Sequence, residues 1–240
     1  MIGTLRQSGS LKALFPRDTQ QALQAVFLNT AGGLTGGDRM VIEAAATGGA
    51  HMVLSSQAAE RGYRAQPGQV ARVETRLKAG PGGRIDWIPQ ETILFEGAAL
   101  DRRLHVDLAQ DATALIVEPV VFGRMAMGEA LHDLRFTDQW RVYRDGRLFF
   151  ADAVRLIGDA HAALQRKAIG AGAAAMATVL FAAPDAARSL PLPDTAGASL
   201  IADDVLLIRF LARDSFALRR DLIPVIEALT SALIPRVWRL

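Results

Sequence analysis

The stretch Asn29-Thr30-Ala31-Gly32-Gly33-Leu34-Thr35-Gly36-Gly37-Asp38 lies between two apolar segments, residues 25–28 and 40–43. Glycine loses the most backbone freedom on folding, so such a cluster is typical of conformations that other residues cannot reach. The apolar segments on either side have the composition of buried strands. The stretch therefore predicts a tight connection between two strands, with Gly36 or Gly37 at positive φ.

A glycine-rich stretch can also cradle a phosphate, but this sequence favours a structural turn. A P-loop needs Lys and then Ser or Thr after its last glycine. Here Asp38 follows Gly37, and its negative charge would repel a phosphate. No helical pattern follows, as a dinucleotide fingerprint would require. Because glycines punctuate strands far more often than they bind ligands, we interpret Gly32, Gly33, Gly36 and Gly37 as a structural motif.

The composition describes one large domain, residues 1–240, without a nucleic-acid or membrane partner. Half of the residues are hydrophobic, enough for a sizeable core. Lys and Arg number 27 against 25 Asp and Glu, so no basic footprint for nucleic acid is present. No apolar run reaches membrane-spanning length, and there is no signal peptide. The chain has no cysteine, which excludes disulfides and thiolate metal sites and fits a cytoplasmic protein.

Short apolar or alternating segments separated by glycine turns predict a mainly β domain with a few helices, one near the C-terminus. Thr47–Ala50 resembles a hairpin turn, Asp145-Gly146 is a strong one, and the buried strand 113–117 is expected to end at Glu118-Pro119. Residues 170–183 fit a helix or a strand, and 184–197 fit a surface loop. Leucines and valines at helical spacing predict a helix over 216–234. The further expected strands are 11–15, 51–56, 70–77, 84–88, 92–95, 104–108, 131–136, 140–143, 148–150 and 206–211.

No catalytic motif is present. The four histidines have no metal-ligand spacing, and there is no GxSxG elbow. The notable polar groups stand beside apolar or turn residues: Asp38, Gln57, Glu91, Glu96, Glu118, Arg124 and Glu129. A buried carboxylate must be paired or hydrated. These groups therefore either form structural bridges, with Arg124 as a partner, or line a polar passage through the β core.

Five motifs in order make the chain resemble the urease accessory protein UreD family, also called UreH. The match runs from about Leu5 to Trp238. Ahead of this match the family usually carries a further N-terminal segment with a first strand, which is expected to be missing here. In place of the Lys-Val or Lys-Phe of many members, this chain has Arg61-Gly62. The motifs are NTAGGLTGGD (29–38), QAAER with YR (57–64), WIPQETILF (87–95), GRMAMGE (123–129) and PRVW (235–238).

The resemblance implies a β-helix-like fold and a non-enzymatic role in urease maturation. Members of the family act with a helical partner, UreF, and a GTP-hydrolysing partner, UreG, to load nickel into apo-urease. They are thought to bridge the GTPase complex to urease and to pass nickel through an internal tunnel. The GTP chemistry would then belong to the partner.

A nickel conduit should bind its cargo only in transit, with no stably bound cofactor. Ni²⁺ stands high in the divalent affinity order, so sparse oxygen ligands suit delivery better than a dense histidine site. We expect at least two of Asp38, Glu91, Glu118 and Glu129 to share an internal cavity. In the tail, Arg236 and Trp238 are expected to bind the helical partner, because Trp and Arg are favoured interface anchors.

Two other readings of the sequence remain open. A small β-fold hydrolase could use Glu91 and Glu129 as a carboxylate dyad, which requires the two carboxyls about 5–9 Å apart in an open cleft. A purely structural adaptor would bind the same partners and never touch nickel.

Overall fold

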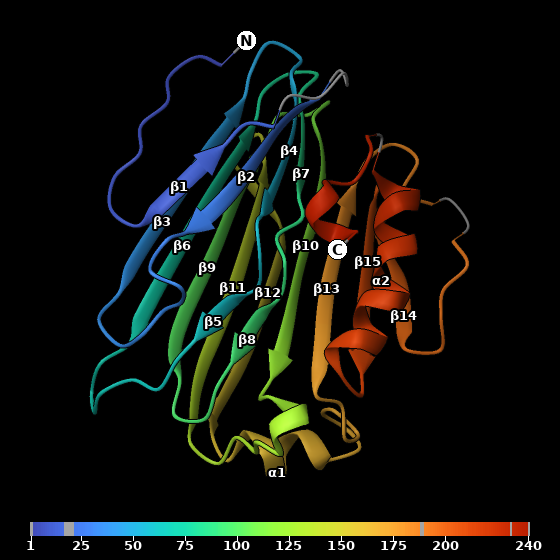
Figure 1. Ribbon diagram of the computed structural model, residues 1–240. Coiled ribbons are helices and arrows are strands. Elements are labelled where there is room, and N and C mark those ends of the chain that lie inside the picture. The colour runs from blue at the N-terminus through green and yellow to red at the C-terminus, as the bar shows by residue number, and fades with distance from the viewer. Residues whose placement is uncertain (1, 17–21, 188–189, 231, 240) are drawn as a thin grey trace.

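The computed structural model describes residues 2–16, 22–187, 190–230 and 232–239, which form two facing β-sheets with one helix packed outside the larger sheet (Figure 1). The larger sheet runs in the order β1 (Leu11–Leu14), β2 (Leu23–Asn29), β4 (His51–Ser56), β7 (Arg84–Trp87), β10 (Thr113–Phe122), β13 (Ala175–Ala182), β15 (Val205–Ala212), β14 (Ala196–Ala202), with β5 (Glu60–Gly62) and β8 (Thr92–Leu94) joining beside β10. The smaller sheet runs β12 (Arg147–Gly158), β11 (Leu134–Arg144), β9 (Ala99–Leu108), β6 (Ala71–Ala79), β3 (Arg39–Ala46).

The chain alternates between the two sheets, so that consecutive strands form stacked coils. Strands β2, β4, β7 and β10 are parallel neighbours in one sheet, and β3, β6, β9 and β11 are parallel neighbours in the other. The β-helix-like, mainly β fold is thereby confirmed. The coils stack without a sequence repeat because the alternation of apolar residues is enough to set which side of each strand faces the core.

The glycine stretch of residues 29–38 is a corner between coils, because β2 lies in the larger sheet and β3 in the smaller. Gly37 has φ of +90°, which confirms the predicted positive φ. Thr47–Ala50 is also a corner, so the expected hairpin there is wrong: β3 and β4 belong to different sheets. The Asp145-Gly146 hairpin is confirmed, since β11 and β12 pair antiparallel on either side of it.

Valine at Gly36 or Gly37 is expected to lower the free energy of unfolding by more than about 1 kcal/mol. A Cβ at Gly36 would lie 2.6 Å from the Cβ of Gln69, while Gly37 has a backbone conformation that strains a β-branched residue. Urea denaturation measures the loss. Gly197→Val is the matched control, because a Cβ there meets open space within a strand. Wild-type stability in both corner variants would contradict the prediction.

Strand β10 does not end at Pro119 as expected, but continues to Phe122. Backbone alternation explains why. Successive backbone amides of a strand point to opposite neighbours. The Phe122 amide donates to the Ala174 carbonyl on the β13 side, and the Gly123 amide donates to the Leu94 carbonyl on the β8 side. Counted back from Phe122, the nitrogen of Pro119 therefore faces the side of β7 and β8. There β7 ends at the level of Ile116 and β8 begins at the level of Val120. Proline lacks an N–H, and none is needed in this interval.

Other element boundaries also differ from the expectation. Residues 131–136 and 140–143 contribute to one long strand, β11, and the segment around 148–150 extends to Gly158. Residues 170–183 contain β13, and the loop expected at 184–197 leads into β14 from residue 196. Within the segment 57–64 the chain forms the short strand β5. Three short helical elements were not predicted: α1 (Ala160–Gln165), η1 (Met125–Met127) and η2 (Arg236–Trp238).

Helix α2 (Ser215–Leu229) covers the outer face of β13 and β15, opposite the smaller sheet (Figure 1). Asp214 caps its first turn by accepting a hydrogen bond from the Ala217 amide. The buried face includes Leu218, Leu222 and Val225, as the helical spacing predicted, but the helix ends before residue 234. Residue 231 lies outside the described part of the chain. None of the described helices is long and apolar enough to cross a membrane.

Candidate functional site

A cavity of about 240 Å³ lies between the two sheets, where β4 and β7 end and β5 and β8 begin. Ladder hydrogen bonds stop in this interval, so side chains and irregular backbone form the wall. We call it the inter-sheet cavity. Its polar lining includes Asn29, Ser56, Glu60, Gln90, Thr92, Arg102 and Glu118.

A larger groove of about 1270 Å³ opens toward the start of β4, but it is the weaker candidate. Its acidic residues Glu43, Glu74 and Asp107 are paired with neighbouring Arg76 or His105. Much of its charged lining belongs to outward positions of the smaller sheet, where surface ion pairs contribute little to stability. The inter-sheet cavity instead has two charged lining residues that are removed from solvent, Arg102 and Glu118.

At the wall of the inter-sheet cavity, Arg102 bridges the carboxylates of Glu118 and Asp138. Arg102 Nη2 lies 2.6 Å from Asp138 Oδ2 and 3.0 Å from Glu118 Oε2. Its Nε donates to Asp138 Oδ1 at 3.1 Å. The three residues come from β9, β10 and β11, so this buried triad ties the smaller sheet to the larger one.

Two tryptophans complete the hydrogen bonding of Glu118. Trp87 Nε1 donates to one carboxylate oxygen at 2.9 Å, and Trp140 Nε1 donates to the other at 3.2 Å. Burial lowers the pKa of Arg102, but the Asp138 and Glu118 carboxylates outweigh it and the pKa is raised. The guanidinium is therefore permanently charged, and it anchors the acidic residues in the core.

Burial raises the pKa of Glu118 to about 7, against the lowering effect of Arg102. The unfolded chain would titrate this group near 4.5. Between these pH values the folded protein binds more protons at Glu118, so the contribution of this group to stability is lost as the pH rises through that window. Near neutral pH the carboxyl can therefore exist in either protonation state.

Glu60 is a second carboxylate of the inter-sheet cavity, and the glycine stretch holds it in place. Asn29 Nδ2 donates to both Glu60 oxygens at 3.2 Å and to the Gly33 carbonyl at 3.1 Å. The Arg61 amide donates to Glu60 Oε1 at 3.1 Å. Burial is the main cause of a raised pKa at Glu60. The corner that decides the fold thus also shapes the wall of the cavity.

Of the four carboxylates predicted to matter, only Glu118 lines the inter-sheet cavity, so the expectation that at least two of them share it is wrong. Asp38 is exposed and accepts a hydrogen bond from the Thr35 amide at 2.7 Å. Glu91 points to the other side of the larger sheet, where it pairs with Arg219 of α2 at 3.0 Å. The chemical environment of each carboxylate follows from the direction of its side chain, which adjacent glycine or proline residues do not determine.

Glu129 pairs with Arg124, which confirms the expected arginine bridge. Arg124 Nε and Nη2 donate to the two Glu129 oxygens at 2.9 and 3.0 Å. These bonds are the main cause of the lowered pKa of Glu129, and the Arg124 guanidinium lies 4.5 Å from the Phe95 ring centroid. The pair joins the two ends of the loop formed by residues 124–129. Glu91 and Glu129 are thus held by different arginines, an arrangement that does not favour a carboxylate dyad.

The C-terminal tail is part of the fold, which corrects the expectation for Trp238. Its side chain is 1 % exposed, and its Nε1 donates to the Ile88 carbonyl at 2.9 Å. A tryptophan held in this way cannot anchor a partner, and deleting residues 235–240 would disrupt the core. Arg236 remains exposed.

Arg102, Asp138 and Glu60 were not predicted from the sequence as site residues. A signal was available for the first two. On β9, Arg102 stands in phase with inward Leu100 and Leu104, and on β11 Asp138 stands in phase with Phe136 and Trp140. A charged residue in the apolar phase of a strand indicates a buried ionic cluster. Nothing comparable identified Glu60, because its segment has no clear alternation. In the part of the chain that the structure describes, no three His, Asp or Glu side chains are grouped to hold a metal ion.

Comparison with known proteins gives matches across the whole chain. The family model described as UreD urease accessory protein matches residues 1–239. A protein of Ruegeria pomeroyi is 48% identical over 242 residues, covering 99% of this chain and 94% of that relative. A protein of Ruegeria sp. strain TM1040 is 49% identical, covering 100% and 84%, and one of Roseobacter denitrificans is 46% identical, covering 100% and 89%. All three relatives are named Urease accessory protein UreD.

Proposed function

Because the chain belongs to the family of UreD urease accessory proteins, we propose that it is an assembly factor in urease maturation that helps to pass nickel to apo-urease. It acts as a scaffold and not as a catalyst. The alternative of a small hydrolase loses its basis, since Glu91 and Glu129 are each neutralised by a separate arginine.

The observation that carries the nickel proposal is the inter-sheet cavity with its two carboxylates. Glu60 and Glu118 both line it, together with the polar side chains of Asn29, Gln90 and Thr92. Carboxylate, amide and hydroxyl oxygens are weak, exchangeable ligands for Ni²⁺ compared with histidine or cysteine. Arg102 beside Glu118 also opposes tight cation binding. The lining therefore suits a cargo that must leave again.

The partners that we propose are a UreF-like helical protein, a UreG-like GTPase and apo-urease, in the cytoplasm. The phosphate-binding signature that GTP would need is missing from the glycine stretch, so the nucleotide belongs to the GTPase. Phe216 in the first turn of α2 and Leu233 after its end are exposed large apolar residues, and Arg236 in the tail is exposed as well. Such side chains are suited to contacts with a helical partner.

Glu60→Gln is expected to lower the nickel content of urease to less than about half, while the accessory complex still assembles. The substitution removes the charge of a cavity carboxylate and keeps its shape, so cation transfer loses a ligand without a new void. The experiment restores each variant in a host that lacks this protein, then measures urease-bound nickel and complex recovery on the same samples.

Glu43→Gln is the matched control, because Glu43 is a surface carboxylate paired with Arg76 on the outside of the smaller sheet. It should leave both measurements unchanged. If Glu60→Gln and Glu43→Gln behave alike and nickel loading is normal, the protein is an adaptor that does not touch nickel. If urease activation does not depend on this chain at all, the proposed function is wrong.

A further inference from the structure

The larger sheet has an interruption that leads from the inter-sheet cavity toward α2. On one side of β10, the partner strand β7 ends at Trp87 and the partner strand β8 begins at Thr92. Residues 88–91, which we call the linker, cross this interval without forming a ladder. Beside it, β4 ends at Ser56 and β5 begins at Glu60. The interruption is therefore filled by linker backbone and side chains and not by paired strands.

Gln90 contacts both sides of the sheet through this interruption. Gln90 lines the inter-sheet cavity, yet its Oε1 accepts a hydrogen bond from Arg219 of α2. Its amide nitrogen Nε2 is buried and has no hydrogen-bond partner among the described residues. An unsatisfied buried donor is costly and indicates a position where water or a polar ligand is bound. Gln90 thus occupies the route through the sheet and leaves one donor free within it.

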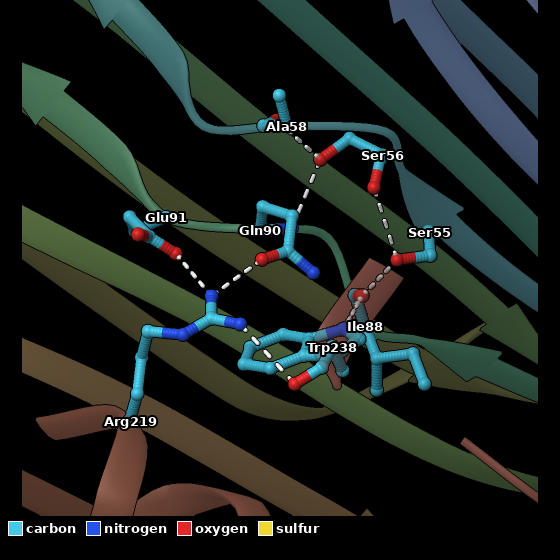
Figure 2. Close-up of polar contacts among 8 residues, drawn as sticks. All are labelled: Ser55, Ser56, Ala58, Ile88, Gln90, Glu91, Arg219 and Trp238. Carbon is cyan, nitrogen blue, oxygen red and sulfur yellow. Dashed lines mark hydrogen bonds and ion pairs between the residues drawn. The ribbon is translucent and has the colours of Figure 1, made fainter. Parts of the chain in front are cut away.

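Arg219 holds the linker from outside. Its Nη1 donates to both Gln90 and Glu91, its Nη2 donates to the Trp238 carbonyl at 3.2 Å, and its guanidinium lies 5.0 Å from the Trp238 ring centroid (Figure 2). From inside, Ser56 Oγ accepts a hydrogen bond from the backbone N–H of Gln90 at 2.9 Å. Beneath the linker, Ser55 Oγ donates to the Ile88 carbonyl at 2.8 Å. Figure 2 shows the linker residues in contact with the serines of β4 and with Arg219.

We propose that the linker is a closed port through the larger sheet, with Gln90 as its plug and Arg219 as the positioning residue that keeps it shut. When Arg219 is drawn away from Gln90 and Glu91, the linker loosens and the inter-sheet cavity opens toward the face that carries α2. An anionic group on a partner that docks beside α2 would compete for this guanidinium. This inference rests on the proposed function, because the port gives the cargo a second way into or out of the cavity.

The chain has no cysteine, so a single introduced thiol reports on the port. Ser55→Cys places that thiol beneath the linker at a fully buried position. A small cationic methanethiosulfonate reagent is added to the isolated folded protein, and its reaction is followed by mass spectrometry. In the Arg219→Met background, labelling should become about tenfold faster or more, because the rate follows the population of the open state. Arg219→Lys should give an intermediate rate, because lysine keeps the positive charge but lacks the two terminal guanidinium nitrogens that donate to the linker and to Trp238.

Two controls separate a port from general loosening. Arg220→Met removes the neighbouring arginine, which pairs with Asp221 and not with the linker, and should leave the labelling of Cys at position 55 unchanged. Thr178→Cys places a buried thiol on β13, and its labelling should stay slow with or without Arg219. Equal labelling of position 55 with and without Arg219 would overturn the proposal, as would faster labelling at both thiols. The measurement needs neither urease nor nickel, so its outcome is independent of a failure in urease activation.

Discussion

Replacement of Arg102 by methionine is expected to lower the free energy of unfolding by about 3–5 kcal/mol. The guanidinium compensates Glu118 and Asp138, and all three side chains are buried between the sheets. Methionine fills the space of the arginine stem but leaves two carboxylates without a cation in a region of low dielectric. Urea denaturation monitored through the buried tryptophans measures the loss.

The loss should be greater at pH 8 than at pH 5. At low pH the carboxyl of Glu118, whose pKa burial raises to about 7, takes up a proton and needs no cation. Arg103→Met is the matched control. Arg103 follows Arg102 on β9 but faces outward and makes a surface pair with Asp101. Its cost should be below about 1 kcal/mol. An effect of Arg102→Met no larger than that of Arg103→Met would show that the buried triad does not stabilise the fold.

Trp238→Ala is expected to destabilise the protein by about 3–5 kcal/mol, although the residue is only two positions from the end of the chain. Trp238 is fully buried against the core that α2 forms with β13 and β15, and it donates to the Ile88 carbonyl. Alanine leaves a large void and removes one of the two hydrogen bonds that the Ile88 carbonyl accepts, while the bond from Ser55 Oγ remains. Thermal and urea unfolding measure the effect.

Phe216→Ala is the control for Trp238→Ala, since Phe216 is 73 % exposed on the same helix-bearing side. Its effect should remain within about 0.5 kcal/mol. Trp238→Phe should fall between the two, because it keeps most of the packing and loses the hydrogen bond. A Trp238→Ala variant as stable as Phe216→Ala would restore the interpretation of the tail as a free docking segment.

The amino-acid sequence by itself determined the strand-rich, mainly β character of the domain, whereas the β-helix-like coils were implied by the resemblance to a known family. The glycine stretch at 29–38 marks a connection between strands because few other residues adopt the backbone conformations needed there, and the alternation in segments such as 104–108 sets the inner side of each strand. These are local properties, so they can be read from neighbouring residues. The Asp145-Gly146 hairpin, the helix beginning near residue 216 and the pairing of Arg124 with one of the acidic residues were also predicted from the sequence.

Only the tertiary structure decided which polar groups meet. Arg102, Glu118 and Asp138 lie on three strands of two sheets, and they come together because coil stacking places their inward positions at one level. Glu91 and Glu118 look equivalent in the sequence, but side chains that project to opposite faces of the sheet put one beside α2 and the other in the cavity. Trp238 was expected to bind a partner because Trp and Arg are favoured interface anchors, whereas it fills a space made by residues far away in the chain. Register, sheet assignment and the packing of distant segments depend on the whole fold, and no local pattern contains them.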